Sequence, residues 1–424
     1  MSMLLLVAML LAGCGSAPAE PGVEAAEYRP ETAPGDADGT DIFDAGAQAG
    51  TLTPDEVLER VRANPGAAYL FAANVGKGDA LVLRVGGKVW LVDTGKAKAR
   101  GRVLRALEAM GAGDGREGVF LTHTDDDHVG GLEWLPDALP VGSWYAPAMY
   151  TGVKEGKHPV AKVAGDAVKW LRRGDAIPLE GGATLKVLAP ASLFTDKDDN
   201  NSLVLMLESD QGRMLLAGDM ELPEEAELLS FRDDLNCAVL KVPNHADDDT
   251  TSAAFARACA AQIAVISTDG AEKPGTPDPG VVSRLRAAGS QVVTTEDSGL
   301  GIFVTLEGGV AAAYSVDFGA PTVEGAYVAE VDPEDDRIVL GNRGDAAFDL
   351  GGCYLYSDRG GELFPFPEGA SIQPGGKLTV GTNSTDGQFD ILWDDKKVVH
   401  RKKTDNIYLY DSWGRVVDYG DNGM

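Results

Sequence analysis

Hydrophobic and polar residues follow two different patterns along this chain, and the change comes near residue 315. Before that point, short apolar runs of the kind found in buried strands are interleaved with amphipathic helical segments. After it, short strand-like runs recur at intervals of roughly ten residues, separated by Gly, Asp and Pro turns. The pattern therefore predicts an α/β domain of two sheets with helices outside, followed by an all-β sandwich.

Expected elements can be placed along both parts. Strands are expected over 69–73, 80–85, 88–93, 119–121, 183–188, 202–208, 213–217, 238–242 and 262–266, and later over 337–340, 353–356, 377–380 and 406–410. Helices are expected over 102–110, 223–230, 252–260 and 279–288. Gly86 and Gly87 predict a hairpin. Thr53 followed by Pro54 and Glu56 predicts the start of a short helix that ends near Asn64.

The amino terminus predicts an exported protein. The apolar run Leu4–Leu11 is too short to span a membrane but has the length of a signal-peptide core. It ends in Leu11–Cys14, which resembles a bacterial lipobox, and this resemblance implies a signal peptide over 1–13 and a lipid on Cys14. An ordinary signal peptide or a buried helix are the alternatives, and no Lys or Arg precedes the run. Residues 14–65 are acidic and rich in Ala, Gly and Pro, which predicts a flexible tether from membrane to domain.

Composition narrows the class of protein. The chain of 424 residues is 44% hydrophobic and 24% charged, so it is not disordered as a whole. Its net charge of −29 argues against a generally basic surface that coats nucleic acid, and leaves room for a local basic cleft. Cys237 and Cys259 are candidates for a bridge, but we expect these two and Cys353 to be small buried apolar residues.

The stretch Leu121–Gly131 carries the main chemical signal. It presents His123, Asp125, Asp127 and His128 directly after an apolar strand. Imidazole and carboxylate side chains at a strand end are suitable ligands for a divalent metal. A solvated acidic loop is the alternative interpretation.

Other polar groups follow apolar strands elsewhere and could gather at the same sheet edge. These are the turn Asn74–Asp79, Asp93, Asp219 and His245. Asp93 is expected to hold the metal loop by hydrogen bonds rather than to contact metal. His158 and His400 have no neighbours of the right type, and we expect both to be solvated.

Taken together, these segments resemble the metallo-β-lactamase fold, and most closely its ComEC-like branch. The matching motifs are His-x-Asp-x-Asp-His at His123–His128, together with Asn74–Asp79, Asp93–Gly95, Asn200–Leu205, Leu215–Asp219 and Leu240–His245. The resemblance implies a four-layer αββα sandwich over 66–318. It places one metal with His123, Asp125 and Asp219, and a second with Asp127, His128, Asp219 and His245. It also places an amide of Asn200 or Asn201 near the first metal.

The same resemblance implies metal-assisted hydrolysis, with Asp127 as the catalytic group that orients or deprotonates the attacking water. Asp125 in place of a histidine favours manganese or magnesium over zinc, although zinc remains a candidate. One departure matters: the branch usually has His-His-Gly-Ser where this chain has Asn244–Asp247. If the first histidine of that pair is the ligand, Asn244 has replaced it. If His245 reaches the metal, the change is modest.

Residues 319–424 resemble a lamin-tail domain, an immunoglobulin-like sandwich, through Ile338–Asn342, Phe364–Gly369 and Ile372–Gly376. Such domains resemble accessory modules of secreted nucleases. The basic residues Lys396, Lys397 and His400–Lys403 could contact DNA or anionic lipid. The acidic run Asp332–Asp336 lacks calcium-loop spacing and is interpreted as a turn.

We therefore expect a lipid-anchored extracytoplasmic metallohydrolase with two divalent ions, acting as a phosphodiesterase or nuclease on DNA. Two basic clusters could follow a phosphate backbone, one made of Lys96, Lys98, Arg100, Arg102 and Arg105, and one of Lys154, Lys157, Lys162, Lys169, Arg172 and Arg173. Solvated helix faces are the alternative for both. Trp134, Trp144 and Tyr145 could stack bases or belong to the core.

The rival functions are hydrolysis of a small ester, lactone or phosphate, and binding at the cell surface without turnover. The sequence has no channel portion, so we do not expect it to transport DNA alone.

Overall fold

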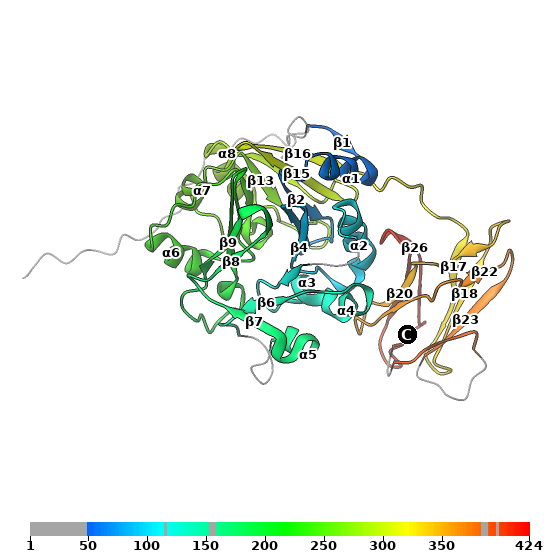
Figure 1. The fold of residues 1–424 in the computed structure, drawn as a ribbon. Helices are drawn as coiled ribbons and strands as arrows, with labels where there is room; N and C mark the ends of the chain where they lie inside the picture. Colours follow the sequence, from blue (N-terminus) through cyan, green and yellow to red (C-terminus); the bar gives the residue numbers. More distant parts are fainter. Residues whose placement is uncertain (1–48, 114–116, 152–157, 383–388, 396–397) are drawn as a thin grey trace, which may run out of the picture. The chain divides into compact units, whose positions relative to one another are not determined.

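The computed structural model describes residues 49–113, 117–151, 158–382, 389–395 and 398–424 (Figure 1). The expected signal peptide, Cys14 and the tether up to residue 48 lie outside the described residues. Within the described part, no helix is both long enough and apolar enough to cross a bilayer.

The end of the expected tether belongs to the folded domain. Strand β1 (Thr51–Leu52) pairs in parallel with β16 (Val310–Val316) of the first sheet. Helix α1 (Pro54–Ala63) begins at Thr53, whose side chain accepts from the backbone N–H of Glu56 while the Glu56 side chain accepts from that of Thr53. Val57 and Val61 of this helix are fully buried. The tether prediction is therefore wrong for residues 51–63, because these two valines and the strand pairing attach the segment to the sheet.

The first sheet has nine strands in the order β1-β16-β15-β2-β3-β4-β5-β6-β7. Their bounds are β2 (Ala68–Ala73), β3 (Leu81–Val85), β4 (Lys88–Val92), β5 (Gly118–Phe120), β6 (Trp144–Pro147), β7 (Val168–Leu171), β15 (Gly301–Glu307) and β16 (Val310–Val316). Gly86 and Gly87 form the expected turn between β3 and β4, both with positive φ. From β4 to β7 the strands are parallel, so their carboxyl ends meet at one edge.

The second sheet has seven strands in the order β14-β13-β12-β11-β10-β9-β8. They span β8 (Ala176–Pro178), β9 (Thr184–Ala189), β10 (Val204–Ser209), β11 (Gly212–Leu216), β12 (Val239–Lys241), β13 (Ile263–Ile266) and β14 (Gln291–Thr294). The strands from β11 to β14 are parallel. Polar residues that follow β11 and β12 therefore reach the same edge of this sheet.

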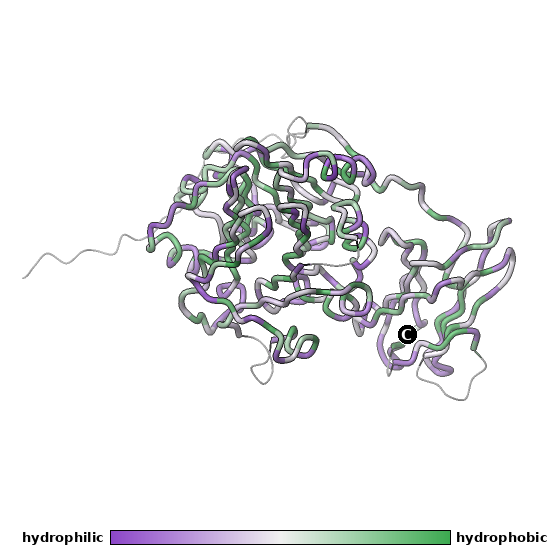
Figure 2. Tube along the Cα trace, in the orientation of Figure 1, coloured by the Kyte–Doolittle hydropathy of each residue, from purple (hydrophilic) through white to green (hydrophobic). Residues whose placement is uncertain are grey.

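Helices cover the outer face of each sheet, which completes the four layers expected from the sequence. Helices α1 and α2 (Arg100–Ala109) pack on the first sheet, whereas α6 (Leu222–Ser230), α7 (Ala253–Cys259) and α8 (Pro279–Ala287) pack on the second (Figure 1). Leu83 and Phe120 of the first sheet meet Leu205 and Leu216 of the second in the layer between them. Apolar segments accordingly gather along the central strands in Figure 2. The remaining short helices are α3 (Asp126–Val129), α4 (Leu135–Ala138) and α5 (Val160–Ala164).

From residue 317 onward the described residues form strands and turns without a helix. One sheet has the order β17-β18-β23-β24, the other β21-β20-β25-β26, and β19 pairs with β22. Their bounds are β17 (Ala326–Asp332), β18 (Arg337–Asn342), β19 (Phe348–Asp349), β20 (Tyr354–Ser357), β21 (Leu363–Pro365), β22 (Ser371–Ile372), β23 (Lys377–Thr382), β24 (Ile391–Trp393), β25 (Asn406–Tyr410) and β26 (Val416–Asp421). Leu340, Leu355 and Ile407 share one core. The all-β prediction is confirmed, and the acidic run forms the turn between β17 and β18.

Candidate metal centre

The stretch Leu121–Gly131 leaves the first sheet at its parallel edge. Its strand β5 is fully buried between β4 and β6, so the backbone of Thr122 and His123 is held beside the end of β4. Asp93, which follows β4, donates its N–H to the carbonyl of Phe120 at 2.8 Å. The chain then turns into α3, where the N–H of His128 donates to the carbonyl of Asp125. This turn brings His123 and His128 back to the same side, with ring centroids 4.2 Å apart.

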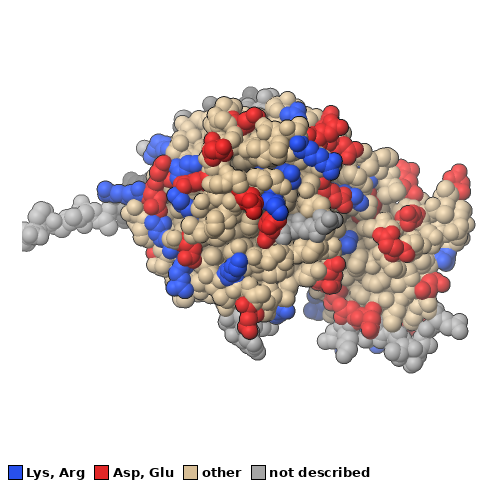
Figure 3. Space-filling view, in the orientation of Figure 1, with Lys and Arg blue, Asp and Glu red and all other residues tan. Residues whose placement is uncertain are grey.

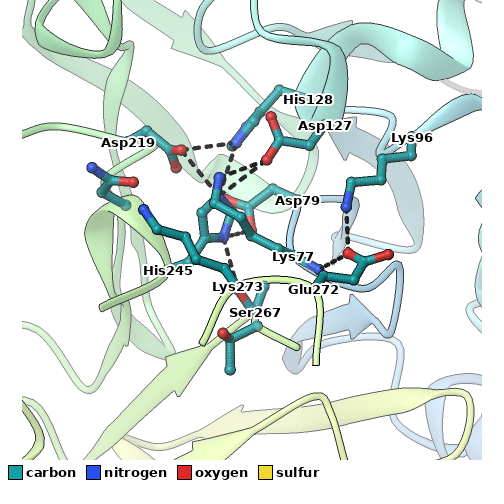
Figure 4. Close-up of polar contacts among 12 residues, drawn as sticks. Lys77, Asp79, Lys96, Asp127, His128, Asp219, His245, Ser267, Glu272 and Lys273 are labelled. Carbon is teal, nitrogen blue, oxygen red and sulfur yellow. Dashed lines mark hydrogen bonds and ion pairs between the residues drawn. The ribbon is translucent and has the colours of Figure 1, made fainter. Parts of the chain in front are cut away.

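Three side chains from distant segments converge at the centre (Figure 4). His128 Nε2 and His245 Nε2 lie 3.3 Å apart. Asp219 Oδ2 lies 3.2 Å from the first and 3.0 Å from the second. His128 comes from α3, Asp219 follows β11 and His245 follows β12, so both sheets contribute at their facing edges.

The hydrogen bonds behind the two rings show why a cation fits between them. His128 Nδ1 lies 2.8 Å from Asp93 Oδ2, and His245 Nδ1 lies 2.7 Å from the carbonyl of Ser267. Each Nδ1 faces an acceptor and therefore carries a proton, so a ring that binds a cation would do so in its neutral form, through the lone pair on Nε2. Two lone pairs and a carboxylate oxygen then point into one space, which is the donor set of a divalent metal site.

A second group of possible ligands includes His123. Single ligand atoms of His123, Asp125 and Asp199 lie within 4.8 Å of one another, and the same holds for His123 with His128 and Asp219. His123 Nε2 and Asp219 Oδ1 are buried and have no hydrogen-bond partner among the described residues. Buried polar atoms without partners are costly, so both atoms are suited to an ion. The residues present thus fit a site for two neighbouring metal ions.

The expected ligand sets can be compared with these groups. Asp127, His128 and His245 form one group, as the second set predicted, and Asp219 contacts both of these histidines. In the first set, Asp125 groups with Asp199 rather than with Asp219. The sequence analysis missed Asp199, although it is the neighbour of the Asn200-Asn201 turn. The Asn200 amide donates to Glu221 and the Asn201 amide donates to the carbonyl of Phe194, and the placing of one of them near the first metal stays a prediction.

Charge around the centre favours ionised carboxylates. Burial raises the pKa of Asp127, but His128, His245 and Lys77 outweigh it and bring that pKa down to about 2. Lys77 Nζ donates to Asp127 Oδ2 at 2.7 Å. Burial likewise opposes the ionisation of Asp219, and the two histidines bring its pKa well below the usual range. Both carboxylates are therefore available as acceptors at neutral pH.

The residues Asn244–Ala246 have an unusual backbone. Asn244, His245 and Ala246 have φ values of 43°, 52° and 61°, a left-handed region that non-glycine residues rarely adopt. This conformation directs His245 to the centre, whereas the Asn244 amide lies 3.5 Å from Glu221 and 3.4 Å from Asp249. Of the two alternatives left open by the sequence, the geometry favours the one in which His245 reaches the metal.

A buried ion pair between Lys241 and Asp79, not predicted from the sequence, adjoins the metal centre. Lys241 and Asp79 are both fully buried, and Lys241 Nζ lies 2.5 Å from Asp79 Oδ2. The Asp79 backbone N–H also donates to the carbonyl of Asp127 at 3.1 Å. The available signal was a lysine among the apolar residues of β12, because a fully buried lysine requires an acidic partner.

Asp93 and His158 are both buried, and each bears on a prediction from the sequence. Asp93 accepts from the Thr122 N–H at 2.8 Å and from the Thr122 hydroxyl at 2.7 Å, which agrees with its expected role as a support for the loop. His158 is fully buried against Tyr150 and Trp170, so the prediction that it is solvated is wrong. Burial lowers the pKa of His158 to about 4.

The aromatic and cysteine candidates belong to the core. Trp134, Trp144 and Tyr145 are at most 8% exposed, so packing rather than base stacking explains them. Cys237, Cys259 and Cys353 are free and buried.

The basic clusters do not form one continuous field. Lysines and arginines are interspersed with acidic residues over the visible face in Figure 3. In the first cluster, Lys96 and Lys98 contact Glu272, Arg102 donates to the carbonyl of Asn74, and Arg105 pairs with Glu108. In the second, Lys154 and Lys157 lie outside the described residues, and Arg173 pairs with Asp233.

Family models match both parts of the chain. The model of the metallo-beta-lactamase superfamily matches residues 73–270, and that of the lamin tail domain matches residues 321–421. The chain contains a metallo-beta-lactamase domain and a lamin tail domain. Asp79, Asp93, His123–His128, Asp219 and His245 all lie within the metallo-beta-lactamase match.

Relatives of the metallo-beta-lactamase domain include ComEC-like proteins. ComE operon protein 3 of Bacillus subtilis is 26% identical over 185 residues, which are 43% of this chain and 24% of that protein. Competence protein ComA of Neisseria gonorrhoeae is 27% identical over 258 residues, 60% of this chain and 34% of that protein. The uncharacterized protein YcaI of Escherichia coli is 27% identical over 238 residues, 54% and 29% of the two chains. The chain thus spans between about a quarter and a third of the length of these relatives.

Among solved structures, the metallo-beta-lactamase fold protein YhfI from Bacillus subtilis aligns with a TM-score of 0.38 and 13% identity. The alignment covers 56% of this chain and 99% of that one. The superfamily match and the grouped ligand atoms together support a metal-dependent hydrolase as the general class of activity.

Proposed function

We propose that the chain is a metal-dependent phosphodiesterase that cleaves DNA outside the cytoplasm and is anchored through a lipid on Cys14. The observation that carries the proposal is the convergence of His128 Nε2, His245 Nε2 and Asp219 Oδ2 beside Asp127. The names of two relatives, a competence protein and Recombination protein 2 of Haemophilus influenzae, are compatible with a nucleic-acid substrate.

The ligands would divide between two ions. His123, Asp125 and Asp199 would hold one, Asp127, His128 and His245 would hold the other, and Asp219 would lie between them. Divalent ions bound there would lower the pKa of water and stabilise negative charge on phosphate oxygens. The mixture of carboxylates with three imidazoles suits manganese or zinc, and magnesium remains an alternative.

Residues of the chain supply the rest of the chemistry. Asp127 is ionised at neutral pH, so its carboxylate can accept a proton from the attacking water or orient it. Lys77 donates to Asp127 and so restricts the orientation of its carboxylate. The Lys77 ammonium also offers positive charge to a phosphate oxygen that enters the centre.

The space beside the centre carries charges of both signs. A cavity of about 810 Å³ adjoins Asp127, and its lining includes Lys96, Lys98 and Lys162 together with Asp126, Asp127 and Glu133. The lysines offer positive charge to a phosphate, but the carboxylates offset it, so this wall by itself does not select phosphate over an uncharged ester or lactone.

The decisive experiment compares the wild type with Asp127→Asn on single- and double-stranded DNA, with manganese, magnesium or zinc, while bound metal is measured. We expect cleavage by the wild type and a loss of at least ~10²-fold in kcat for the variant, because removal of a general base costs about that much. Asp137→Asn changes an exposed acid of α4 that does not line this cavity and should retain activity. If the wild type binds metal and leaves DNA intact with all three ions, the nuclease proposal is wrong. Hydrolysis of bis(p-nitrophenyl) phosphate without DNA cleavage would then indicate a small phosphodiester.

A further inference from the structure

The carboxylate of Glu272 is held by three nitrogen donors beside the metal centre (Figure 4). Its Oε2 accepts from the backbone N–H of Lys77 at 2.9 Å and from the Lys96 ammonium. Its Oε1 accepts from the Lys98 ammonium at 2.8 Å. One anionic group thus receives hydrogen bonds from two separate segments of the chain.

These donors are directly linked to the proposed catalytic group. The backbone of Lys77 binds Glu272 while the side chain of the same Lys77 binds Asp127. An anion at the position of the Glu272 carboxylate therefore lies next to the attack site.

The turn around Gly76 is shaped to admit an anion. Gly76 has φ +81°, and a Cβ added there would lie 2.5 Å from Glu272 Oε2. A side chain at this position would displace the carboxylate, so the glycine leaves room for an oxygen atom close to the backbone. Backbone N–H groups exposed in this way, combined with lysines, are typical of phosphate-binding loops.

Glu272 itself belongs to a turn rather than to a strand or helix. It lies in the connection between β13 and α8, where its N–H donates to the carbonyl of Asp269. The two lysines come from another segment, since Lys96 precedes the short helical turn Ala97–Ala99 after β4 and Lys98 lies within it. The side chains of Glu272, Lys96 and Lys98 are 26%, 25% and 33% exposed. Solvent can therefore reach both ion pairs, and an anion can compete with Glu272 for the two lysines.

We propose that Gly76, Lys77, Lys96 and Lys98 form a subsite for a phosphate group of the substrate, and that Glu272 occupies this subsite until substrate displaces it. The inference rests on the proposed function, since it assigns the subsite to the phosphate next to the one that is cleaved. The carboxylate of Glu272 has the charge and the acceptor oxygens of that phosphate. Substrate binding would exchange one set of charge-assisted hydrogen bonds for another.

The test is binding of a fluorescein-labelled single-stranded oligothymidylate to the full chain in EDTA, measured by fluorescence anisotropy over a range of salt concentrations. Glu272→Gln removes the competing charge with little change in shape, and we expect at least ~5-fold tighter binding. Lys98→Ala removes one donor, and we expect weaker binding and a salt slope smaller by about 0.7, the value for one phosphate contact on a single strand. Lys96→Ala should act in the same direction.

Lys88→Ala and Glu117→Gln provide matched controls. Lys88 Nζ pairs with Glu117 Oε1 at 2.8 Å at the start of β4, which is the end of that strand opposite the metal centre. Both controls should bind like the wild type. The proposal is overturned if Glu272→Gln and the two lysine variants bind like the wild type, or if the Lys88 variant changes binding equally. If a lysine variant fails to fold, the affinity of Glu272→Gln compared with that of the wild type still tests the proposal.

The two proposals fail in different ways. Lysine-dependent binding in EDTA, without cleavage in any metal, would retain the subsite and reject the nuclease. Cleavage that is insensitive to Lys96, Lys98 and Glu272, with unchanged binding, would retain the nuclease and reject the subsite.

Discussion

The two histidines at the centre are oriented by the atoms behind them. Asp93 lies behind His128 and the Ser267 carbonyl lies behind His245, and each accepts a hydrogen bond from the Nδ1 of its histidine. The opposite nitrogens are thereby left as acceptors that point at Asp219. Partners of this kind set the tautomer and the angle of the ring, so they influence metal affinity without contacting metal.

Asp93→Asn should therefore weaken metal binding by about 10–100-fold. Asp93 accepts three hydrogen bonds, two from Thr122 and one from His128, and an amide would turn an NH₂ group toward one of these donors. Isothermal titration with manganese or zinc measures the effect. Asp137→Asn, an exposed acid in α4, is the control and should retain wild-type affinity. Equal affinity in both variants would show that Asp93 has no part in holding His128.

At the scale of an element, α6 combines a structural role with an electrostatic cost. It packs Leu228 into the core of the second sheet, and its first turn buries Glu224 completely. Burial, followed by the charge of Glu227, raises the pKa of Glu224 well above its usual range. The folded protein thus retains this proton at pH values where the unfolded chain has released it.

The sign of the resulting pH dependence follows from linkage. Below the unfolded pKa of about 4.3 both states carry the proton, and the helix contributes its full stability. As pH rises, the unfolded chain loses the proton first, so the free energy of unfolding decreases until the folded pKa is reached. Each unit between the two pKa values corresponds to about 1.4 kcal/mol.

Glu224→Gln should remove this loss. We expect the free energy of unfolding of the variant, measured by urea denaturation, to increase relative to that of the wild type as the pH rises from 5 to 8. Glu59→Gln, at an exposed position of α1, should show no such trend. A difference between variant and wild type that is constant with pH would contradict the argument.

At the scale of the whole molecule, charge limits how the protein can stay at a membrane. A protein with a net charge of −29 is repelled by a membrane surface that carries anionic lipid. Retention at the surface through electrostatics alone is therefore unfavourable. The proposed lipid on Cys14 would supply the missing free energy, at about 0.8 kcal/mol for each buried CH₂ group.

Cys14→Ala should consequently move the protein from the membrane fraction to the soluble extracytoplasmic fraction, as followed by fractionation and immunoblotting. Ser16→Ala changes a residue nearby without removing the thiol and should leave the protein on the membrane. Unchanged retention of the Cys14 variant would reject the anchor and leave the metal centre unaffected.

The sequence by itself determined what depends on neighbouring residues. Local patterns predicted the capping box at Thr53 and the hairpin at Gly86 and Gly87, because both form through contacts between residues a few positions apart. The order of the two domains followed from the change in hydrophobic pattern along the chain. The grouping of His123 with His128 belongs here as well, since six residues carry both rings to one side of the loop.

Only the tertiary structure decided which distant residues meet. The resemblance had placed His128 and His245, 117 positions apart, at one metal, but nothing in the sequence indicated that Lys77 would contact Glu272, 195 positions away. The grouping of Asp199 with His123 and Asp125, the pairing of Lys241 with Asp79 and the burial of His158 all depend on how the elements pack. A local signal such as the lysine in β12 indicates that a partner is needed but not which one, because the free energy that selects the partner comes from packing two sheets and their helices together.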